Sequence, residues 1–307
     1  MDLHGLYVPL ITPFTASGEL APGALERLAH DVLDAGAAGI VALGTTGEPA
    51  TLTEAERHRV LDVCARVCRE RSATLIAGAG SNDTAASARA VAGLRAWPEV
   101  SAALTVVPYY TRPSEAGVVA HFTELAAASP VPLLIYNIPQ RTGVEIGWRA
   151  LRRLAGLPGI AGMKQAVGGI DAGTVMLMSD LPDGFAVLCG DDTFASPLLA
   201  LGASGAIMAS AHVATSAFAE MTGAWHSGAA GRARTLGHRL TGLAAALFAE
   251  PNPTVIKGVL HAQARIPSAA VRLPLLEASA ASVAAAQEAL EALDSAEAPA
   301  DKAPAAA

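Results

Sequence analysis

The stretch LLIYNIPQRTGVEIGWRALRRLAGLPGIAGMK (133–164) decides the fold, because it joins two apolar runs of strand length through a longer segment. Gly, Pro and polar residues bound both runs, 133–136 and 160–164, as they do around buried strands. Further runs of this kind lie at 7–12, 39–43, 74–77, 103–107, 186–189 and 206–208. Most of the intervening segments repeat apolar residues at helical spacing, as Leu25, Leu28 and Val32 do. The chain therefore alternates strands with helices.

This alternation predicts an α/β fold of the (β/α)₈ TIM-barrel type, because parallel strands joined by right-handed crossovers close economically into a barrel. A doubly wound open sheet is the competing architecture. It often carries G-x-G-x-x-G after its first strand, and no such loop follows Ile11. Beyond 208 only helical patterns continue. We therefore expect a catalytic barrel domain (1–226), a C-terminal helical domain (227–294) and a disordered tail (295–307).

The composition excludes several classes of protein. Of 307 residues, 52% are apolar, and 21 Lys plus Arg stand against 28 Asp plus Glu, a net charge of −7. Because no basic run occurs, we expect neither nucleic-acid nor membrane partners. The opening MDLHGLYVPLITPF lacks the features of a signal peptide, so we expect a cytoplasmic protein. Three cysteines without a C-x-x-C predict neither a disulfide framework nor a zinc site.

Two reactive side chains, Tyr136 and Lys164, end apolar runs, and in such a barrel the carboxyl ends of the strands build the active site. At an apolar mouth desolvation favours the neutral amine of Lys164, which can attack a ketone to form an imine, whereas Arg cannot. Alternatively, Lys164 points into solvent or pairs with Asp191 or Asp192. The Tyr136 phenol can transfer protons, or its ring can simply be buried with a wet hydroxyl. Lys257 is expected to be structural.

Two other segments carry groups that can bind carboxylates. Thr45 and Thr46, in GTTGE (44–48), supply hydroxyls and loop amides beside glycines that allow close backbone approach. Such Gly-Thr turns also cap helices. The planar guanidinium of Arg141 can bind a carboxylate in bidentate fashion or form a surface ion pair.

Tyr109 and Tyr110 are adjacent, so their side chains diverge if the backbone is extended. One can then enter the site while the other packs elsewhere, for example at a subunit contact. The histidines are scattered without the spacing of metal ligands, so we expect no metal site beside the acidic pair 191–192.

Together these motifs resemble the dihydrodipicolinate synthase / N-acetylneuraminate lyase family of class I aldolases. The matching segments are VPLITPF (8–14), GTTGE (44–48), PYYTRP (108–113), YNIPQRTG (136–143), GMK (162–164), GDD (190–192), EPNPTVIK (250–257) and RLP (272–274). They cover most of the chain in order, which makes the joint signal strong. The resemblance implies a TIM barrel with a C-terminal helical extension, and a homotetramer.

The resemblance also implies the catalytic chemistry. Pyruvate forms a covalent imine with Lys164, so neither a cofactor nor a metal is implied. Tyr136 is the proton donor and acceptor. Thr45 and Tyr110 complete a proton relay, with Tyr110 reaching in from a neighbouring subunit.

For the substrates, the resemblance implies that Thr46 holds the pyruvate carboxylate and that the backbone of Ile207 lies near it. Arg141 receives the carboxylate of the incoming aldehyde. GTTGE, YY-x-RP and R-T-G after YNIP are similar to the synthases, which condense pyruvate with L-aspartate 4-semialdehyde to 4-hydroxy-tetrahydrodipicolinate, in lysine and diaminopimelate biosynthesis. The alternatives are a pyruvate-dependent aldolase for another aldehyde (sugar acid, hydroxy-oxo acid or N-acetylneuraminate type) and a non-catalytic metabolite-binding barrel.

The chain departs from the synthase pattern at two places. Gln165 stands where synthases commonly carry Glu or Asp, and the pair KQ also occurs among the lyases. At the family's lysine-feedback site Asn82 and Tyr109 match, but Glu54 and Ala86 replace the His and Glu of feedback-sensitive members. The pattern for lysine inhibition is therefore incomplete.

Overall fold

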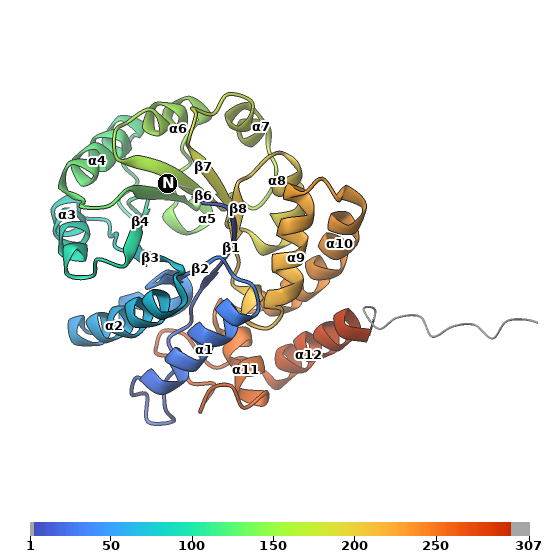
Figure 1. The fold of residues 1–307 in the computed structure, drawn as a ribbon. Helices are drawn as coiled ribbons and strands as arrows, with labels where there is room; N and C mark the ends of the chain where they lie inside the picture. The colour runs from blue at the N-terminus through green and yellow to red at the C-terminus, as the bar shows by residue number, and fades with distance from the viewer. Residues whose placement is uncertain (1–2, 296–307) are drawn as a thin grey trace, which may run out of the picture.

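Parallel strands close into a barrel in chain order from β1 to β8 in the computed structural model, which describes residues 3–295 (Figure 1). The strands are β1 Gly5–Pro9, β2 Gly39–Ala42, β3 Thr74–Gly78, β4 Val100–Val106, β5 Leu133–Asn137, β6 Ile160–Gln165, β7 Ala186–Cys189 and β8 Gly205–Ile207. The predicted (β/α)₈ TIM barrel is confirmed.

Strand β1 is shorter than its apolar run predicts. It ends at Pro9, although the chain stays buried as far as Phe14. Beyond the strand, the backbone N–H of Ile11 donates to a side chain from a distant part of the chain, Nε2 of His212, at 3.0 Å. This contact ends the strand pairing and turns the chain toward the loop that follows β8.

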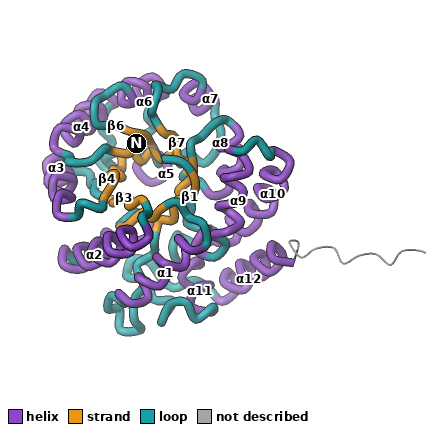
Figure 2. The backbone as a smooth tube through the Cα atoms, viewed as in Figure 1, coloured by secondary structure: helices purple, strands orange, loops and turns teal. Residues whose placement is uncertain are grey.

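Helices surround the barrel and extend it at one side (Figures 1 and 2). Around the barrel lie α1 Pro22–Asp34, α2 Glu54–Arg71, α3 Thr84–Gly93, α4 Glu115–Ala128, α5 Pro139–Thr142, α6 Trp148–Ala155, α7 Ala172–Met178, α8 Ala195–Ala200 and α9 Thr215–His226. The extension consists of α10 Ala230–Leu247, α11 Thr254–Ala262 and α12 Ala280–Ser295. Two short 3₁₀ turns matter for the site, η1 Thr45–Gly47 after β2 and η5 Ser210–His212 after β8.

The start of α2 shows how local sequence sets a helix boundary. Thr53 Oγ1 accepts the backbone N–H of Glu56, and the Glu56 carboxylate accepts the backbone N–H of Thr53 at 2.8 Å. This capping box satisfies amides that have no partner inside the helix. Further along, Cys64 and Cys68 both lie on the buried face of α2.

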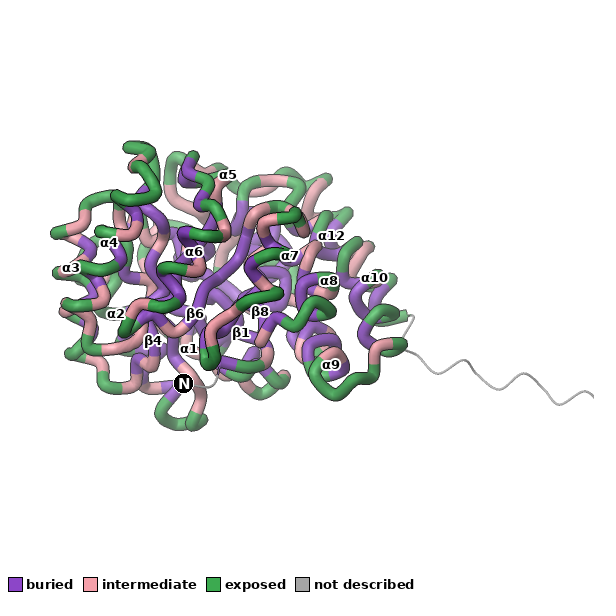
Figure 3. Tube along the Cα trace, turned by 90° about the horizontal axis from the view of Figure 1, so that it is seen from above, coloured by how far each residue is buried: buried purple, intermediate pink, exposed green. Residues whose placement is uncertain are grey.

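Successive residues of each strand face opposite sides of the barrel wall. On β5, Leu134 and Tyr136 belong to the cluster inside the barrel, whereas Leu133 and Ile135 pack under the surrounding helices. Figure 3 shows the strands buried in the middle of the molecule and exposed residues along the outer helices. The alternation aims Tyr136 toward the barrel axis.

The helical extension begins close to the predicted boundary. Helix α9 ends at His226 and α10 begins at Ala230, and α10 packs against both α9 and α12. The division into two domains stays a prediction. Because α12 ends at Ser295, the first residue of the predicted tail is helical, and the rest, 296–307, lies outside the described residues. No helix within residues 3–295 is both long and apolar enough to cross a membrane.

Candidate active site

The structure places Tyr136 and Lys164 side by side at the carboxyl ends of β5 and β6. They are direct partners in the strand register, and Lys164 Nζ lies 4.6 Å from the centre of the Tyr136 ring. Both side chains are buried, with exposed fractions of 6% and 7%. Ile207, at the end of β8, belongs to the same interior cluster as Tyr136. An amine, a phenol and a strand-end backbone therefore share one end of the barrel.

Gly190 makes room for the Lys164 side chain. A Cβ on this glycine would lie 2.6 Å from Lys164 Cε and 2.7 Å from Lys164 Cγ, far inside van der Waals contact. The Gly190 backbone N–H donates to the carbonyl of Gln165 at 2.7 Å, which holds it against β6. Sequence reasoning weighed GDD for its carboxylates and missed the glycine.

The neighbouring carboxylates are held by backbone amides. Asp191 accepts the N–H of Gly168 at 2.6 Å, and the buried Asp192 accepts the N–H of Ser210 at 2.5 Å. Burial raises the pKa of both carboxyl groups, while hydrogen bonds and the charge of Lys164 act to lower it. Both acids therefore contribute to the electrostatic field at Lys164 while holding loops in place.

Metal ligation finds no support in the described part of the chain. Within residues 3–295, no three His, Cys, Asp or Glu side chains are grouped so that they could hold a metal ion.

The GTTGE segment forms the turn η1 beside the barrel mouth. Thr46 is buried, and its Oγ1 accepts a hydrogen bond from Asn252 Nδ2 at 2.9 Å. Thr12, beyond β1, donates its hydroxyl to the carbonyl of Gly47 at 2.7 Å. Thr45 is half-buried at the start of the turn. Two distant segments thus hold the two-threonine turn that the sequence predicts as a carboxylate cradle.

Glu48 closes this turn and is the anchor that sequence reasoning missed. Its φ of +52° is unusual for a side-chain-bearing residue, and the buried carboxylate accepts Lys257 Nζ at 2.5 Å and the backbone N–H of Arg272 at 2.9 Å. Lys257 also donates to the carbonyl of Ala270 and lies 4.1 Å from the centre of the Phe14 ring. Lys257 is thus structural, as predicted.

Two side chains near Glu48, Lys257 and Glu56, have shifted pKa values. Burial lowers the pKa of Lys257 to about 8, although Glu48 acts to raise it. Arg272 binds both oxygens of Glu56, and mainly this contact lowers the pKa of Glu56 to about 2. These charges join EPNPTVIK and RLP to the turn after β2, over separations of more than 200 residues.

The remaining predicted site residues lie at the surface of the single chain. Tyr110 is 88% exposed with a φ of +70°, and Tyr109 is 39% exposed. Arg141 is exposed on α5, just after Tyr136. The structure therefore leaves the Tyr110 phenol in solvent within one chain, as a residue that serves a neighbouring subunit would be.

Gln165 points away from Lys164, into the outer layer of the barrel. Its Oε1 accepts Asn137 Nδ2 at 2.9 Å and its Nε2 donates to Thr174 Oγ1 at 3.1 Å. The departure from the synthase pattern at this position therefore changes a buried contact between β5, β6 and α7, and leaves the barrel mouth as it is.

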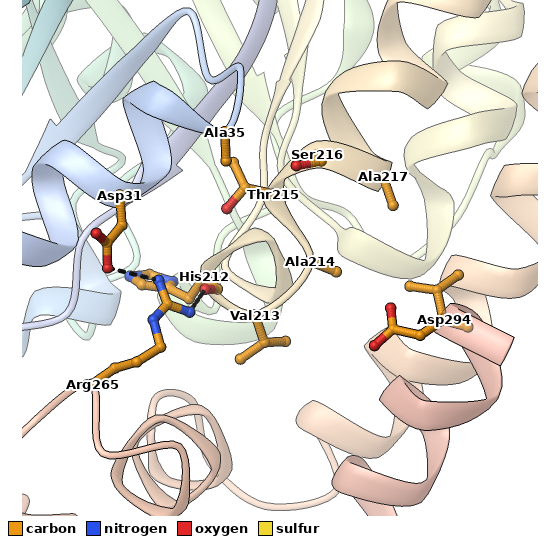
Figure 4. Close-up of a pocket in the computed structure, with 11 residues that line it drawn as sticks. Asp31, Ala35, His212, Val213, Ala214, Thr215, Ser216, Ala217, Arg265 and Asp294 are labelled. Atoms are coloured by element: carbon orange, nitrogen blue, oxygen red, sulfur yellow. Dashed lines mark hydrogen bonds and ion pairs between the residues drawn. The ribbon is translucent and has the colours of Figure 1, made fainter. Parts of the chain in front are cut away.

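A separate cavity of about 270 Å³ lies between α1, the start of α9 and the end of α12 (Figure 4). Its lining includes Asp31, His212 and Arg265, and does not include Lys164 or Tyr136. Arg265 donates to the carbonyl of His212 at 2.6 Å and contacts Asp31 at 3.4 Å. The guanidinium is thus engaged by the protein itself.

Comparison with known proteins gives a consistent result. The model of the Dihydrodipicolinate synthetase family matches residues 2–293. The 4-hydroxy-tetrahydrodipicolinate synthase of Syntrophus aciditrophicus is 39% identical over 272 residues, which are 88% of this chain and 91% of the relative. A dihydrodipicolinate synthase from Acinetobacter baumannii, solved in complex with pyruvate, superposes with a TM-score of 0.90 at 33% identity, covering 95% and 99% of the two chains. The dihydrodipicolinate synthase from Thermotoga maritima superposes with a TM-score of 0.91 at 30% identity, covering 96% of this chain and 99% of the other.

Proposed function

The chain belongs to the dihydrodipicolinate synthetase family, and we propose that its barrel mouth condenses pyruvate with L-aspartate 4-semialdehyde to give 4-hydroxy-tetrahydrodipicolinate. The enzyme is a class I aldolase-type lyase of lysine and diaminopimelate biosynthesis. The observation that carries the proposal is the buried pair of Lys164 and Tyr136 on adjacent strands. Enzymes of this family react through a Schiff base with pyruvate and need no metal, and we assign a cytoplasmic location.

In the proposed reaction, neutral Lys164 Nζ attacks the ketone carbon of pyruvate. Tyr136 donates a proton to the carbinolamine oxygen, which leaves as water, and the imine forms. Loss of a proton from the methyl carbon gives an enamine that attacks the aldehyde. The amino group of the condensed aldehyde then attacks the imine carbon, which closes the ring and releases Lys164 Nζ as the free amine. The buried, preorganised pair lowers the cost of these proton transfers, because little solvent has to reorganise around it.

The remaining roles follow the family pattern. Thr46 donates its hydroxyl to the pyruvate carboxylate, and the backbone of Ile207 lies beside it. Arg141 binds the carboxylate of the aldehyde. Thr45 and Tyr110 relay protons to and from Tyr136. Because Tyr110 is exposed in the single chain, we propose that it acts in a neighbouring subunit of a homotetramer.

The imine is tested by trapping. Borohydride reduction in the presence of pyruvate should add a pyruvate-derived mass to the peptide that contains Lys164, and Lys164→Ala should show no adduct. An unmodified wild-type protein, or the same adduct in the variant, contradicts the proposal.

The acceptor is tested by comparing kcat/KM for L-aspartate 4-semialdehyde, N-acetylmannosamine and sugar aldehydes with pyruvate held constant. Arg141→Ala should reduce kcat/KM most with the carboxylate-bearing aldehyde, because the lost contact is to that group. If the wild-type enzyme prefers another aldehyde, the proposed imine chemistry still holds, but the proposed acceptor, L-aspartate 4-semialdehyde, is wrong. Pyruvate binding without any turnover would instead indicate a binding barrel.

A further inference from the structure

One contact at the mouth comes from outside the barrel. Asn252, in the segment before α11, is buried and donates Nδ2–H to Thr46 Oγ1 at 2.9 Å, across 206 residues of sequence. Helix α11, which follows this segment, supplies Lys257, whose amine binds the carboxylate of Glu48, two residues beyond Thr46. The helical extension thus contacts the turn η1 at the proposed carboxylate-binding threonine and at its anchor.

The direction of this hydrogen bond matters for Thr46. A threonine hydroxyl has one proton to donate and two lone pairs that accept. The amide nitrogen of Asn252 can only donate, so it occupies the acceptor side of the hydroxyl. The proton of Thr46 is then directed to another partner, and an anion such as a carboxylate needs a donor.

We propose that Asn252 is a positioning residue of the pyruvate site, which orients the Thr46 hydroxyl so that its proton faces the pyruvate carboxylate. The inference rests on the proposed function, since it assigns Thr46 to that carboxylate. It adds a residue of the helical extension that acts through Thr46 and need not touch the substrate.

Asn252→Asp and Asn252→Ala separate this role from a structural one. Removing the oriented hydrogen bond in Asn252→Ala should raise the KM for pyruvate about five- to tenfold and change kcat little. At neutral pH, Asn252→Asp should raise it further, because an ionised carboxylate accepts the Thr46 proton and repels pyruvate. Gln263→Glu makes the same change at an exposed position after α11 and should leave the KM unchanged.

The pH dependence is the decisive readout. A protonated carboxylic acid can donate to Thr46 as the amide does. The ratio of the pyruvate KM of Asn252→Asp to that of the wild type should therefore fall toward one as the pH is lowered from about 8 to 5, since burial keeps a carboxyl group protonated to higher pH. Asn252→Ala should show no such recovery. A flat ratio for Asn252→Asp, or an unchanged KM in both variants, overturns the proposal.

A double-variant cycle tests whether Asn252 acts through Thr46. In a Thr46→Val background, Asn252→Ala should add no further increase in the pyruvate KM. An equal increase in both backgrounds would mean that Asn252 acts by another route. Borohydride trapping of the wild type distinguishes failure of the proposed function from failure of this inference. A missing pyruvate adduct contradicts the proposed function. A normal adduct, together with an unchanged pyruvate KM in the Asn252 variants, contradicts only this inference.

Discussion

The Lys164 side chain packs against Gly190, a residue with no side chain of its own. Its Cγ and Cε atoms occupy the space where any side chain at Gly190 would begin, and its register partners are Tyr136 on one strand and Leu188 on the other. An amine that must attack a ketone in one direction benefits from such confinement, because a fixed approach avoids an entropic cost in the transition state. The absence of a side chain at position 190 is thus part of the proposed site.

Gly190→Ala should displace the Lys164 amine. We expect the enzyme to lose at least about tenfold in kcat/KM, because small misplacements of a reacting group are costly, and to trap pyruvate with borohydride more slowly. Gly169→Ala is the matched control, since a Cβ at that loop position meets no atom within 4 Å. Equal activity of the two variants would show that Lys164 has room to adjust.

His212 sets a limit on stability in acid. It is fully buried, with Nδ1 on the carbonyl of Ala209 at 2.8 Å and Nε2 accepting the N–H of Ile11 (Figure 4 shows its surroundings). Burial lowers its pKa to about 4, with the Arg265 charge acting in the same direction. As the pH falls below about 6.5, His212 takes up a proton in the unfolded chain but stays neutral in the folded chain. The free energy of unfolding therefore decreases between pH 6.5 and 4, by on the order of 3 kcal/mol.

This expectation is checked by urea unfolding between pH 7 and 4. His212→Gln keeps an acceptor for Ile11 without the titrating ring, so its free energy of unfolding should fall less steeply over that range than that of the wild type. His238→Gln, at an exposed position on α10, should follow the wild type. Parallel curves for the wild type and His212→Gln would show that another group causes the loss.

Among the secondary-structure elements, those with local signals could be predicted from sequence. The strands follow from short apolar runs, and the start of α2 follows from Thr53 and Glu56. Tyr136 and Lys164 could be placed for the same reason, because each ends such a run. Contacts such as that between Glu48 and Lys257 could not, since their partners lie 209 residues apart and no periodic pattern reports a tertiary contact.

The ion pair of Glu48 and Lys257 joins α11 to the turn after β2, and breaking it should destabilise the fold. Lys257→Met leaves a buried carboxylate without its counter-charge, which should cost about 3–5 kcal/mol in the free energy of unfolding. The double variant Glu48→Gln with Lys257→Met should recover part of that loss. Arg232→Met, which breaks the half-exposed pair with Glu220, should cost less than about 1 kcal/mol. If Lys257→Met lowers the free energy of unfolding no more than Arg232→Met does, the buried ion pair does not stabilise the fold as expected.

At the scale of the whole molecule, the exposure of Tyr110 bears on how the subunits assemble. A phenol that is 88% exposed with a positive φ has no packing role within the chain. In an isologous contact the same residue of each subunit reaches the other, so two neighbours would complete each other's sites. This exchange needs at least two subunits, and the proposed homotetramer should sediment as a particle of about four subunit masses.

Mixed assemblies provide the test of this exchange. Lys164→Ala and Tyr110→Phe are each expected to be nearly inactive alone. When the two variants are co-expressed, a mixed pair contains one complete site, in which Lys164 of the second variant meets Tyr110 of the first. Random pairing should therefore restore about a quarter of wild-type activity. Lys164→Ala with Tyr136→Phe is the matched control, because both residues belong to one chain's site and no mixed pair can combine them. Recovery in neither mixture, or in both, would mean that Tyr110 does not act across subunits.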